Sequence, residues 1–436
     1  MRAFLVLLLA CALHATAYAQ IFDLLPLPQS PEAVALGDAA VATPTADALG
    51  FLSNPALLGH PAAHGVRLSG APSTDWLGFD SINLSSYALM AGLDGRRFGF
   101  PFHVGLGIAR GTISFDVPPT GESVPFDADL EGSFTAVNVG IGYDGPVRTS
   151  LGFGVRWARQ GSGLGVLNGE IPPSLSDLEP DELAAVETLE LDGTTFDLGL
   201  LLEIPLARLV GWRPAGEPAG FDLDVRLAYA RMHGAEEASF SPELSGPPLI
   251  AIDRRVPRIV RLGWAATAGY DVAVGAGHIR AAALTLSIQA DQDVTSQNVG
   301  DWFGTIRLAD ALLGQGNEDR EPCAGGGMDF GLCAVNSYAG RRGVQLALGE
   351  TLTASFGRFE GDGLSEPGKG ATAYGLGFSL GGLARLIGLL QDNPRVHRLG
   401  ERFDLRVTRS VYFANDEDDF DRGTLFWGTT LSAQLP

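Results

Sequence analysis

The chain has 436 residues, and its 51 acidic and 30 basic side chains give a formal net charge of −21 at pH 7. Such an acidic balance argues against nucleic-acid binding, which needs clustered basic residues to meet the phosphates. Hydrophobic residues make up 45% of the chain, which also has 58 glycines. This composition suits a protein that does not hide all of its apolar surface in a core.

Residues 1–19 have the layout of a secretory signal peptide. Arg2 precedes an apolar run from Phe4 to about Leu13, and the small-residue site Ala17–Ala19 follows it. A lipoprotein cleavage site at Cys11 is an alternative, but it would truncate the apolar run and leave the Ala-x-Ala site unused. We therefore predict that the chain is exported and that residues 1–19 are removed.

After the signal, no stretch reaches the roughly 18 to 20 consecutive apolar residues of a membrane-spanning helix. Residues 20–63 also lack the alternation of a strand. Their centre, residues 30–59, is small, weakly apolar and interrupted by Gly37, Pro44 and Asn54-Pro55. We predict that residues 20–63 form a compact plug of short helices and turns.

From about Asp80 onward, apolar side chains recur at every second position, with glycine or polar residues between them. Between Thr135 and Tyr143, for example, Val139 and Ile141 alternate with Gly140 and Gly142. Side chains on a strand point to opposite faces in turn, so each segment has one apolar face and one polar or empty face. Lipid must meet apolar groups while a lumen can be polar, so the pattern predicts a transmembrane β-barrel.

The alternating segments predict about fourteen antiparallel strands within residues 64–436, an even number as in bacterial single-chain barrels. We expect them near residues 64–70, 79–91, 97–116, 131–144, 146–160, 191–204, 220–233, 254–271, 278–291, 341–348, 351–360, 370–381, 403–413 and 424–435. The fold class is thus all-β, and the expected location is the outer membrane of a Gram-negative type of envelope.

Barrels of this kind have short periplasmic turns and long outer loops. The long or polar connections that we expect to face outward are residues 117–130, 161–190, 234–253, 292–340 and 414–423. The tight turns at Asp144-Gly145 and Gly349-Glu350 are expected on the periplasmic side. Two similar segments, 206–211 and 383–388, each suggest a short amphipathic helix at the rim, for anchoring at the membrane interface or for docking a partner.

Several polar residues fall on the predicted inner face of the strands. On this face, a hydrogen-bonded lining or contact with the plug is a simpler interpretation than catalysis. These residues are His103, Asn138, Arg156, Asp222, Asp224 and Arg226.

One string fits the G-x-S-x-G nucleophile elbow of hydrolases, with Ser379 at its centre and Asp392 and His397 following in triad order. The elbow requires a parallel sheet with crossover helices, whereas this string lies in an alternating strand. We therefore predict no enzymatic activity and no cofactor.

Two cysteines remain after signal removal, Cys323 and Cys333, in one glycine-rich loop. In an oxidising compartment they predict a disulfide, because two thiols ten positions apart with no nearby histidine make a poor metal site. Acidic runs in 161–190 and 414–423 are interpreted as solvated loops, with calcium binding as the alternative. We predict no metal site.

The amino-terminal segment resembles a known family. Residues 35–42, ALGDAAVA, followed by Asp47 and by Asn54-Pro55-Ala56-Leu57, are similar to the signature of PorV/PorQ-type proteins, a branch of the FadL-like outer-membrane barrels. The resemblance covers about thirty residues. It implies a fourteen-stranded barrel with a hatch inside its lumen. By the same resemblance, Gly37-Asp38 form the bend before the first hatch helix and Asn54-Pro55-Ala56 form the hatch turn.

Two functions follow as expectations. The resemblance implies an outer-membrane component that serves protein secretion of the type IX kind, with secretion-machinery or cargo proteins as partners. The alternative is a FadL-like passive channel for a hydrophobic ligand. A barrel that presents acidic loops for adhesion is a third possibility. In each case the outer-membrane lipids are partners and nucleic acid is not.

Overall fold

The structure is a computed structural model. It describes residues 29–76, 79–117, 126–166, 188–212, 219–234, 239–241, 258–274, 277–294, 304, 306–316, 320–322, 332–334, 338–360, 370–414 and 423–434. The predicted signal peptide and Cys323 lie outside the described residues, as do both acidic runs apart from their edges.

Fourteen antiparallel strands form a closed barrel, as the alternation predicts. Each strand pairs with its sequence neighbours, except where short strands intervene, and β1 pairs with β17 to close the ring. The barrel strands are β1 (Gly65–Trp76), β2 (Phe79–Asp94), β3 (Phe102–Val117), β4 (Phe126–Asp144), β5 (Arg148–Val166), β6 (Thr188–Pro205), β7 (Gly220–Gly234), β9 (Ile259–Val274), β10 (Gly277–Asp293), β13 (Ala339–Leu348), β14 (Leu352–Glu360), β15 (Ala371–Ser379), β16 (Phe403–Ala414) and β17 (Gly423–Ala433).

The remaining elements are short. They are the strands β8 (Ser239–Ser241), β11 (Arg320–Pro322) and β12 (Leu332–Ala334), the helices α2 (Pro31–Ala35), α4 (Leu206–Leu209), α5 (Leu308–Leu313), α6 (Leu380–Leu390) and α7 (Pro394–Arg402), and the 3-10 helices η1 (Gly50–Leu52), η2 (Pro55–Gly59), η3 (Pro61–Ala63) and η4 (Gly95–Phe98). Among the described residues, no helix has the length and apolar character needed to cross a membrane.

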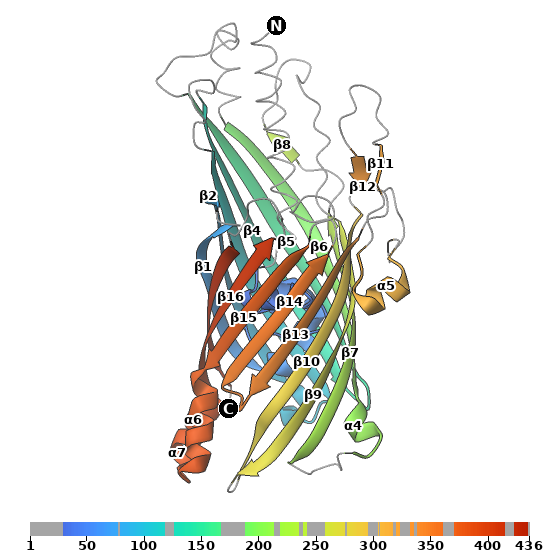
Figure 1. Cartoon of the computed structure of the whole chain (residues 1–436), viewed down its shortest axis with the longest axis vertical. Coiled ribbons are helices and arrows are strands. Elements are labelled where there is room, and N and C mark those ends of the chain that lie inside the picture. Colours follow the sequence, from blue (N-terminus) through green and yellow to red (C-terminus); the bar gives the residue numbers. More distant parts are fainter. Residues whose placement is uncertain are drawn as a thin grey trace, which may run out of the picture.

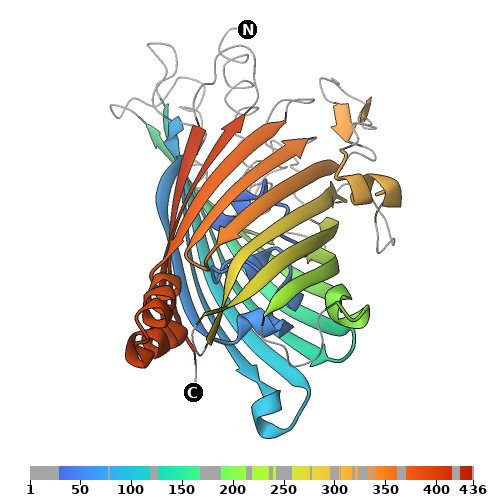
Figure 2. The ribbon, with the colours of Figure 1, turned by 60° about the horizontal axis from the view of Figure 1, so that its bottom comes forward.

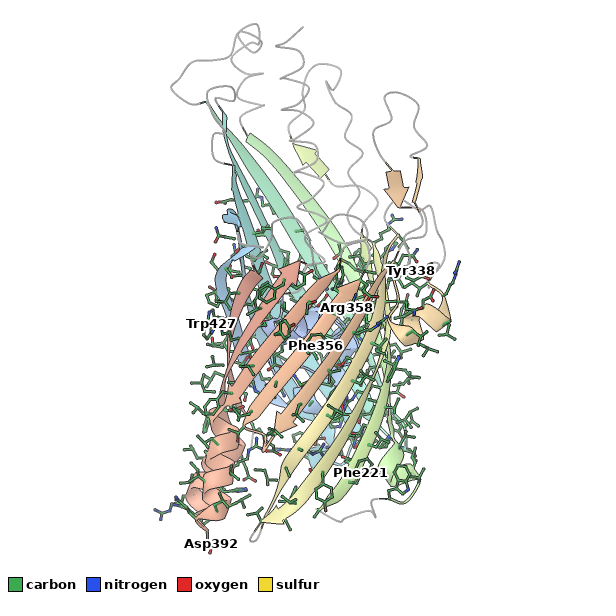
Figure 3. All side chains as sticks on the ribbon, viewed as in Figure 1. Phe221, Tyr338, Phe356, Arg358, Asp392 and Trp427 are labelled. Carbon is green, nitrogen blue, oxygen red and sulfur yellow. The ribbon has the colours of Figure 1, made fainter. Side chains whose placement is uncertain are left out.

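The outer face of the barrel is apolar. On β4, Val139 and Ile141 are 41% and 52% exposed, whereas Gly140 and Gly142 between them are buried. Phe356 and Trp427 lie exposed on the outer wall in the same way (Figure 3). A closed barrel leaves no unpaired strand edge, and its apolar outer face can meet lipid. The protein is therefore an outer-membrane β-barrel.

The two ends of the barrel differ in their connections. The tight turns at Asp144-Gly145 and Gly349-Glu350 lie at one end with α4, α6 and α7, at the bottom of Figure 1. We call this the periplasmic end, because short turns face the periplasm in such barrels. The strand ends that flank the five connections expected to face outward lie at the opposite, outer end.

Several strands extend into segments that we expected to be loops. β4 begins at Phe126, β5 continues to Val166, and β6 begins at Thr188. The pairing of Phe126 with Val166, and of Gly163 with Thr188, explains the extension: strands continue as long as a partner satisfies their backbone groups. The segment 292–340 likewise contains α5, β11 and β12.

Candidate functional site

The candidate site is the barrel interior together with residues 29–64, which we call the N-terminal segment. Figure 2 shows this segment, in blue, enclosed by the ring of strands. Helix α2 contacts β14 to β17, whereas η2 contacts β2 to β6. Most of the side chains from residue 30 to residue 60 are buried. The segment therefore lies across the lumen, with its two halves on opposite walls.

The first half of the segment, residues 30–38, is a single helical turn followed by a sharp bend. The Ser30 hydroxyl accepts a hydrogen bond from the Ala33 amide at 3.0 Å, and Pro31 occupies the first turn, so α2 begins here. Gly37 and Asp38 have φ of 62° and 59°, in the left-handed region. The bend thus follows the first helix, whereas we expected it to precede the helix. The cause is the Ser30-Pro31 start signal, which places α2 before the bend.

The wall beneath the first half is built from glycines. A Cβ atom on Gly343 would lie 2.5 Å from the Leu36 carbonyl oxygen, and Cβ atoms on Gly357 and Gly375 would overlap Gly37 and Ala35. The backbone of the segment can lie directly on β13 to β15 because these positions have no side chain.

Buried ion pairs join the first half to the same wall. An Asp38 carboxylate oxygen lies 2.9 Å from Arg341, which lies 2.8 Å from Asp291 on β10. Glu32 lies 3.3 Å from Arg406 on β16. Burial raises the pKa of Asp38, and the charge of Arg341 opposes that rise.

Asp47 organises the turn between the two halves. Its carboxylate accepts hydrogen bonds from the Ser30 hydroxyl at 2.5 Å, from the Thr45 hydroxyl at 3.0 Å and from the Gly50 amide at 3.1 Å. Burial, with the nearby charge of Glu32, raises the pKa of Asp47 to about 6. This carboxyl group therefore changes its charge near pH 6.

Asn54 links the second half to both the segment and the wall. It is fully buried, and its Oδ1 accepts a hydrogen bond from the Ala56 amide at 3.0 Å. Its Nδ2 donates to the Val41 carbonyl at 2.9 Å and to the Leu200 carbonyl on β6 at 3.3 Å. Asn54 caps η2, with Pro55 in the first turn, so Asn54-Pro55-Ala56 form the start of this 3-10 helix.

Glycines also line the wall beneath the second half. A Cβ atom on Gly140 would lie 2.5 Å from the Gly59 nitrogen, and one on Gly105 would overlap the Leu58 carbonyl. Cβ atoms on Gly142 and Gly152 would overlap backbone atoms of Gly59 and of Pro55 and Ala56. The glycine rows of β3 to β5 are thus the contact surface of η2.

His60 joins the second half to a charged cluster at the periplasmic end. Its Nδ1 accepts a hydrogen bond from the Ala62 amide at 3.0 Å, so the ring proton is on Nε2, which donates to Glu203 at 2.7 Å. Glu203 also lies 2.8 Å from Arg226 and forms an ion pair with Arg148. Burial lowers the pKa of His60 below 6.5, so the ring is neutral at pH 7.

Of the six inner-face residues proposed from the sequence, three are on β7 near the periplasmic end. Arg226 lies 4.0 Å from Asp224, and Asp222 lies 3.2 Å from Arg280. The closest charged partner of Arg226 is Glu203 on β6, rather than Asp222 or Asp224 on its own strand.

The other three inner-face residues are on β3, β4 and β5. Arg156 pairs with Asp197 at 2.5 Å and donates to the Leu52 carbonyl of the segment at 2.6 Å. His103 is buried, with its Nδ1 3.6 Å from Asp94. Asn138 is fully buried and lies over Gly154. Of these three, Arg156 is the one with a hydrogen bond to the segment.

Sequence reasoning missed the charged partners of these residues. Glu203, Asp197, Asp291, Arg341 and Arg406 are all at inner-face positions of their strands. Asp197 lies two positions before Gly199 and therefore shares its face of the strand, so the sequence did contain a signal that this charged residue faces inward.

Ser379, the centre of the hydrolase-like string, caps α6. Its hydroxyl accepts a hydrogen bond from the Gly382 amide and donates one to Asp404, both at 2.8 Å.

An apolar band lines the inner wall on the outer side of the segment. On β17, Gly428 contacts Pro31 of the segment, and Phe426 lies two positions nearer the outer end. On β14, Gly357 contacts Gly37 of the segment, and Phe359 lies two positions nearer the outer end. The band consists of inner-face residues of six strands, most of which pack in clusters with segment residues such as Val34 and Phe51: Leu84, Ile113, Phe134, Phe359, Tyr412 and Phe426. The periplasmic end of the lumen is thus charged, whereas its outer side combines this apolar band with the buried charges of Arg261, Asp291 and Arg341, and the Arg341 guanidinium lies over the Phe359 ring at 4.5 Å.

The predicted disulfide is not described, since Cys323 lies outside the described residues. Among the described residues, no three His, Cys, Asp or Glu side chains are grouped so as to hold a metal ion.

No protein-family model matches the chain, and no curated protein matches it either. Its fold is similar to that of the toluene transporter TodX of Pseudomonas putida, with 11% identity over 92% of this chain and 97% of that chain and a TM-score of 0.41. The toluene transporter TbuX of Ralstonia pickettii gives 12% identity over 93% and 98% of the two chains, with the same TM-score of 0.41. The β domain of the Bordetella autotransporter BrkA gives 9% identity over 86% and 100%, with a TM-score of 0.34. Similarities of this size do not assign a function.

Proposed function

We propose that the protein is a passive outer-membrane channel for small hydrophobic molecules, with residues 20–63 as a hatch in the lumen of the barrel of residues 64–436. The apolar band supports this proposal most directly. Phe426 packs with Val34 of the segment and Phe134 packs with Phe51, so displacement of the segment would give a hydrophobic molecule an apolar surface that favours it over water.

Passage beyond the band requires a change in the N-terminal segment, because its backbone lies against the wall on both sides. The contacts that hold it are non-covalent: ion pairs of Asp38 and Glu32, the His60 hydrogen bond, and packing on glycines. Such contacts can rearrange while the barrel strands keep their pairing. The segment therefore acts as a hatch, and transport is downhill and needs no cofactor.

The test is uptake of a hydrophobic fluorescent probe, N-phenyl-1-naphthylamine, into vesicles that contain the purified protein. We expect Phe426→Asp to lower the uptake rate about tenfold, since a charged side chain makes the band unfavourable for a hydrophobic probe. Ser355→Asp is the matched control, because Ser355 is on the inner face of β14 on the periplasmic side of the Gly357 contact. Equal rates for Phe426→Asp and the wild type would contradict the proposal.

Secretion of proteins, as in PorV/PorQ-type barrels, is the second candidate. It rests on the resemblance of residues 35–42 and 54–57, which form the bend of the segment and the start of η2. The apolar band favours the channel. Deletion of the gene distinguishes the two: loss of an exported cargo from the cell surface with unchanged hydrophobic uptake would support secretion and contradict the channel.

A further inference from the structure

A helical hairpin of residues 380–402, which we call the rim hairpin, projects from the periplasmic end between β15 and β16 (Figure 1). Ser379 caps α6, and the Asn393 side chain caps α7 by accepting from the Arg395 amide at 3.2 Å. The two helices pack closely, because Gly388 lies against the His397 backbone and Gly400 against the Arg385 backbone. The hairpin is thus a packed pair of helices and not an extended turn.

The exposed surface of the rim hairpin has an apolar stripe on one helix and a basic stripe on the other. On α6, Leu380, Ile387 and Leu390 are 46%, 36% and 68% exposed and recur at helical spacing. On α7 the exposed residues that recur at the same spacing are Arg395, Arg398, Leu399 and Arg402. An apolar stripe beside basic side chains is typical of helices that lie in a membrane interface.

The rim hairpin is continuous with the lipid-facing wall. Phe378, just before α6, is 37% exposed, and Phe403 and Leu405, just after α7, are 53% and 40% exposed. β14 and β15 have 9 residues each, whereas β9 and β10 have 16 and 17. Figure 1 shows the hairpin below the short strands, at the level of the lower ends of β9 and β10. It therefore extends the wall where the strands end early.

The charge of the rim hairpin is opposite to that of the whole chain. It has four arginines and two acidic residues, in a chain with a net charge of −21. Arg385 is paired with Glu350 at 2.6 Å, whereas Arg395, Arg398 and Arg402 are on the exposed stripe. Arginine side chains can extend from the edge of an apolar surface to the phosphates of lipid headgroups.

We propose that the rim hairpin binds anionic phospholipids of the periplasmic leaflet. The α6 stripe lies against acyl chains, and the three arginines of α7 contact the headgroup phosphates. The attraction of each arginine for an anionic membrane surface is short-ranged and screened by salt. This binding is independent of whether the lumen conducts hydrophobic molecules.

The test is native mass spectrometry of the full chain released from nanodiscs that contain equal amounts of phosphatidylglycerol and phosphatidylethanolamine. We expect the wild type to retain phosphatidylglycerol preferentially. In the triple variant Arg395→Gln, Arg398→Gln, Arg402→Gln, the ratio of retained phosphatidylglycerol to phosphatidylethanolamine should fall about tenfold. The same three residues changed to Lys are expected to keep most of it, because the charge is kept.

A control removes the same charge elsewhere: Arg110→Gln, Arg342→Gln and Arg358→Gln change three arginines on β3, β13 and β14. This control is expected to retain the preference. The heat-dependent shift of the barrel on electrophoresis verifies that each variant is folded. The proposal is overturned if the α7 glutamine variant keeps the wild-type preference, or if the wild type binds both lipids equally.

Discussion

The two halves of the N-terminal segment are bound to opposite walls of the barrel by different physical means. Residues 30–38 lie on β13 to β17 and are joined to that wall by the ion pairs of Asp38 with Arg341 and of Glu32 with Arg406. Residues 54–63 lie on β2 to β6 with their backbone against glycines. Both halves pack on glycines, but only for the first half do we find ion pairs with arginine among the described residues.

The difference indicates which half moves first. Ion pairs weaken when a charge is lost or screened, whereas backbone packing against a strand does not depend on charge. The second half also leads directly into β1 at Gly65 and is fixed by the chain itself. We therefore expect the first half of the segment to be released more readily than the second half, if the segment acts as the proposed hatch.

The largest effect is expected from Arg341→Met. The substitution leaves Asp38 and Asp291 buried without their shared partner, which costs about 3–5 kcal/mol for a buried pair. Hydrogen exchange of residues 30–38 should accelerate far more than that of residues 54–63. Arg358→Met is the control, since the Arg358 side chain is 54% exposed and its surface pair is worth at most about 1 kcal/mol. Equal acceleration of hydrogen exchange in both halves would show that ion pairs do not hold the first half in particular.

Gly142→Ala is expected to have a smaller effect, confined to the second half. Its Cβ would overlap the Gly59 carbonyl, and overpacking of this kind costs about 1–3 kcal/mol. Hydrogen exchange of residues 54–63 and the midpoint of urea unfolding measure the loss. At Gly377 the added Cβ meets the Thr353 hydroxyl, which can rotate away, so Gly377→Ala should be close to neutral. If the two variants are equally stable, packing on glycine does not hold the second half.

The smallest effects are expected from changes of pH. Protonation of Asp47 and protonation of His60 change the free energy of unfolding in opposite directions. Burial lowers the pKa of His60 below 6.5, so the unfolded state takes up a proton first and stability falls as pH drops below 6.5. The pKa of Asp47 is raised from 3.8 to about 6, so the folded state keeps a proton longer and its stabilising effect is lost as pH rises from 3.8 through 6.

Unfolding measured between pH 4 and pH 8 checks both signs. We expect His60→Gln to abolish the loss on the acid side and Asp47→Asn to abolish the loss on the basic side. A wild-type curve that neither substitution alters would show that other groups control the pH dependence.

The strand framework was predictable because it follows from local alternation. Val139 and Ile141 must face lipid if Gly140 and Gly142 face inward, and this holds whatever the rest of the chain does. The limits of β4, β5 and β6 were not predictable, because a strand ends where its partner ends. The pairing of Phe126 with Val166 is a property of two strands together.

The contacts of the candidate site were less predictable than the strands. The sequence placed Arg226 on the inner face, but its closest partner, Glu203, is on another strand. Likewise, Gly37 was recognisable as a bend, yet its contact with Gly357 joins positions far apart in the chain. Side chains and backbone atoms that meet across a lumen leave no spacing pattern in the sequence.

By itself the sequence determined the medium of this protein: apolar residues at alternate positions require lipid outside and a different environment within, because the strand period is fixed by backbone geometry. The tertiary structure alone decided what the inner glycines do. Gly105, Gly140 and Gly142 could have lined an open pore, but closure of the barrel brings Leu58 and Gly59 directly against them. Glycine lacks a side chain, so its role depends on which atoms occupy that space, and only the folded chain places them.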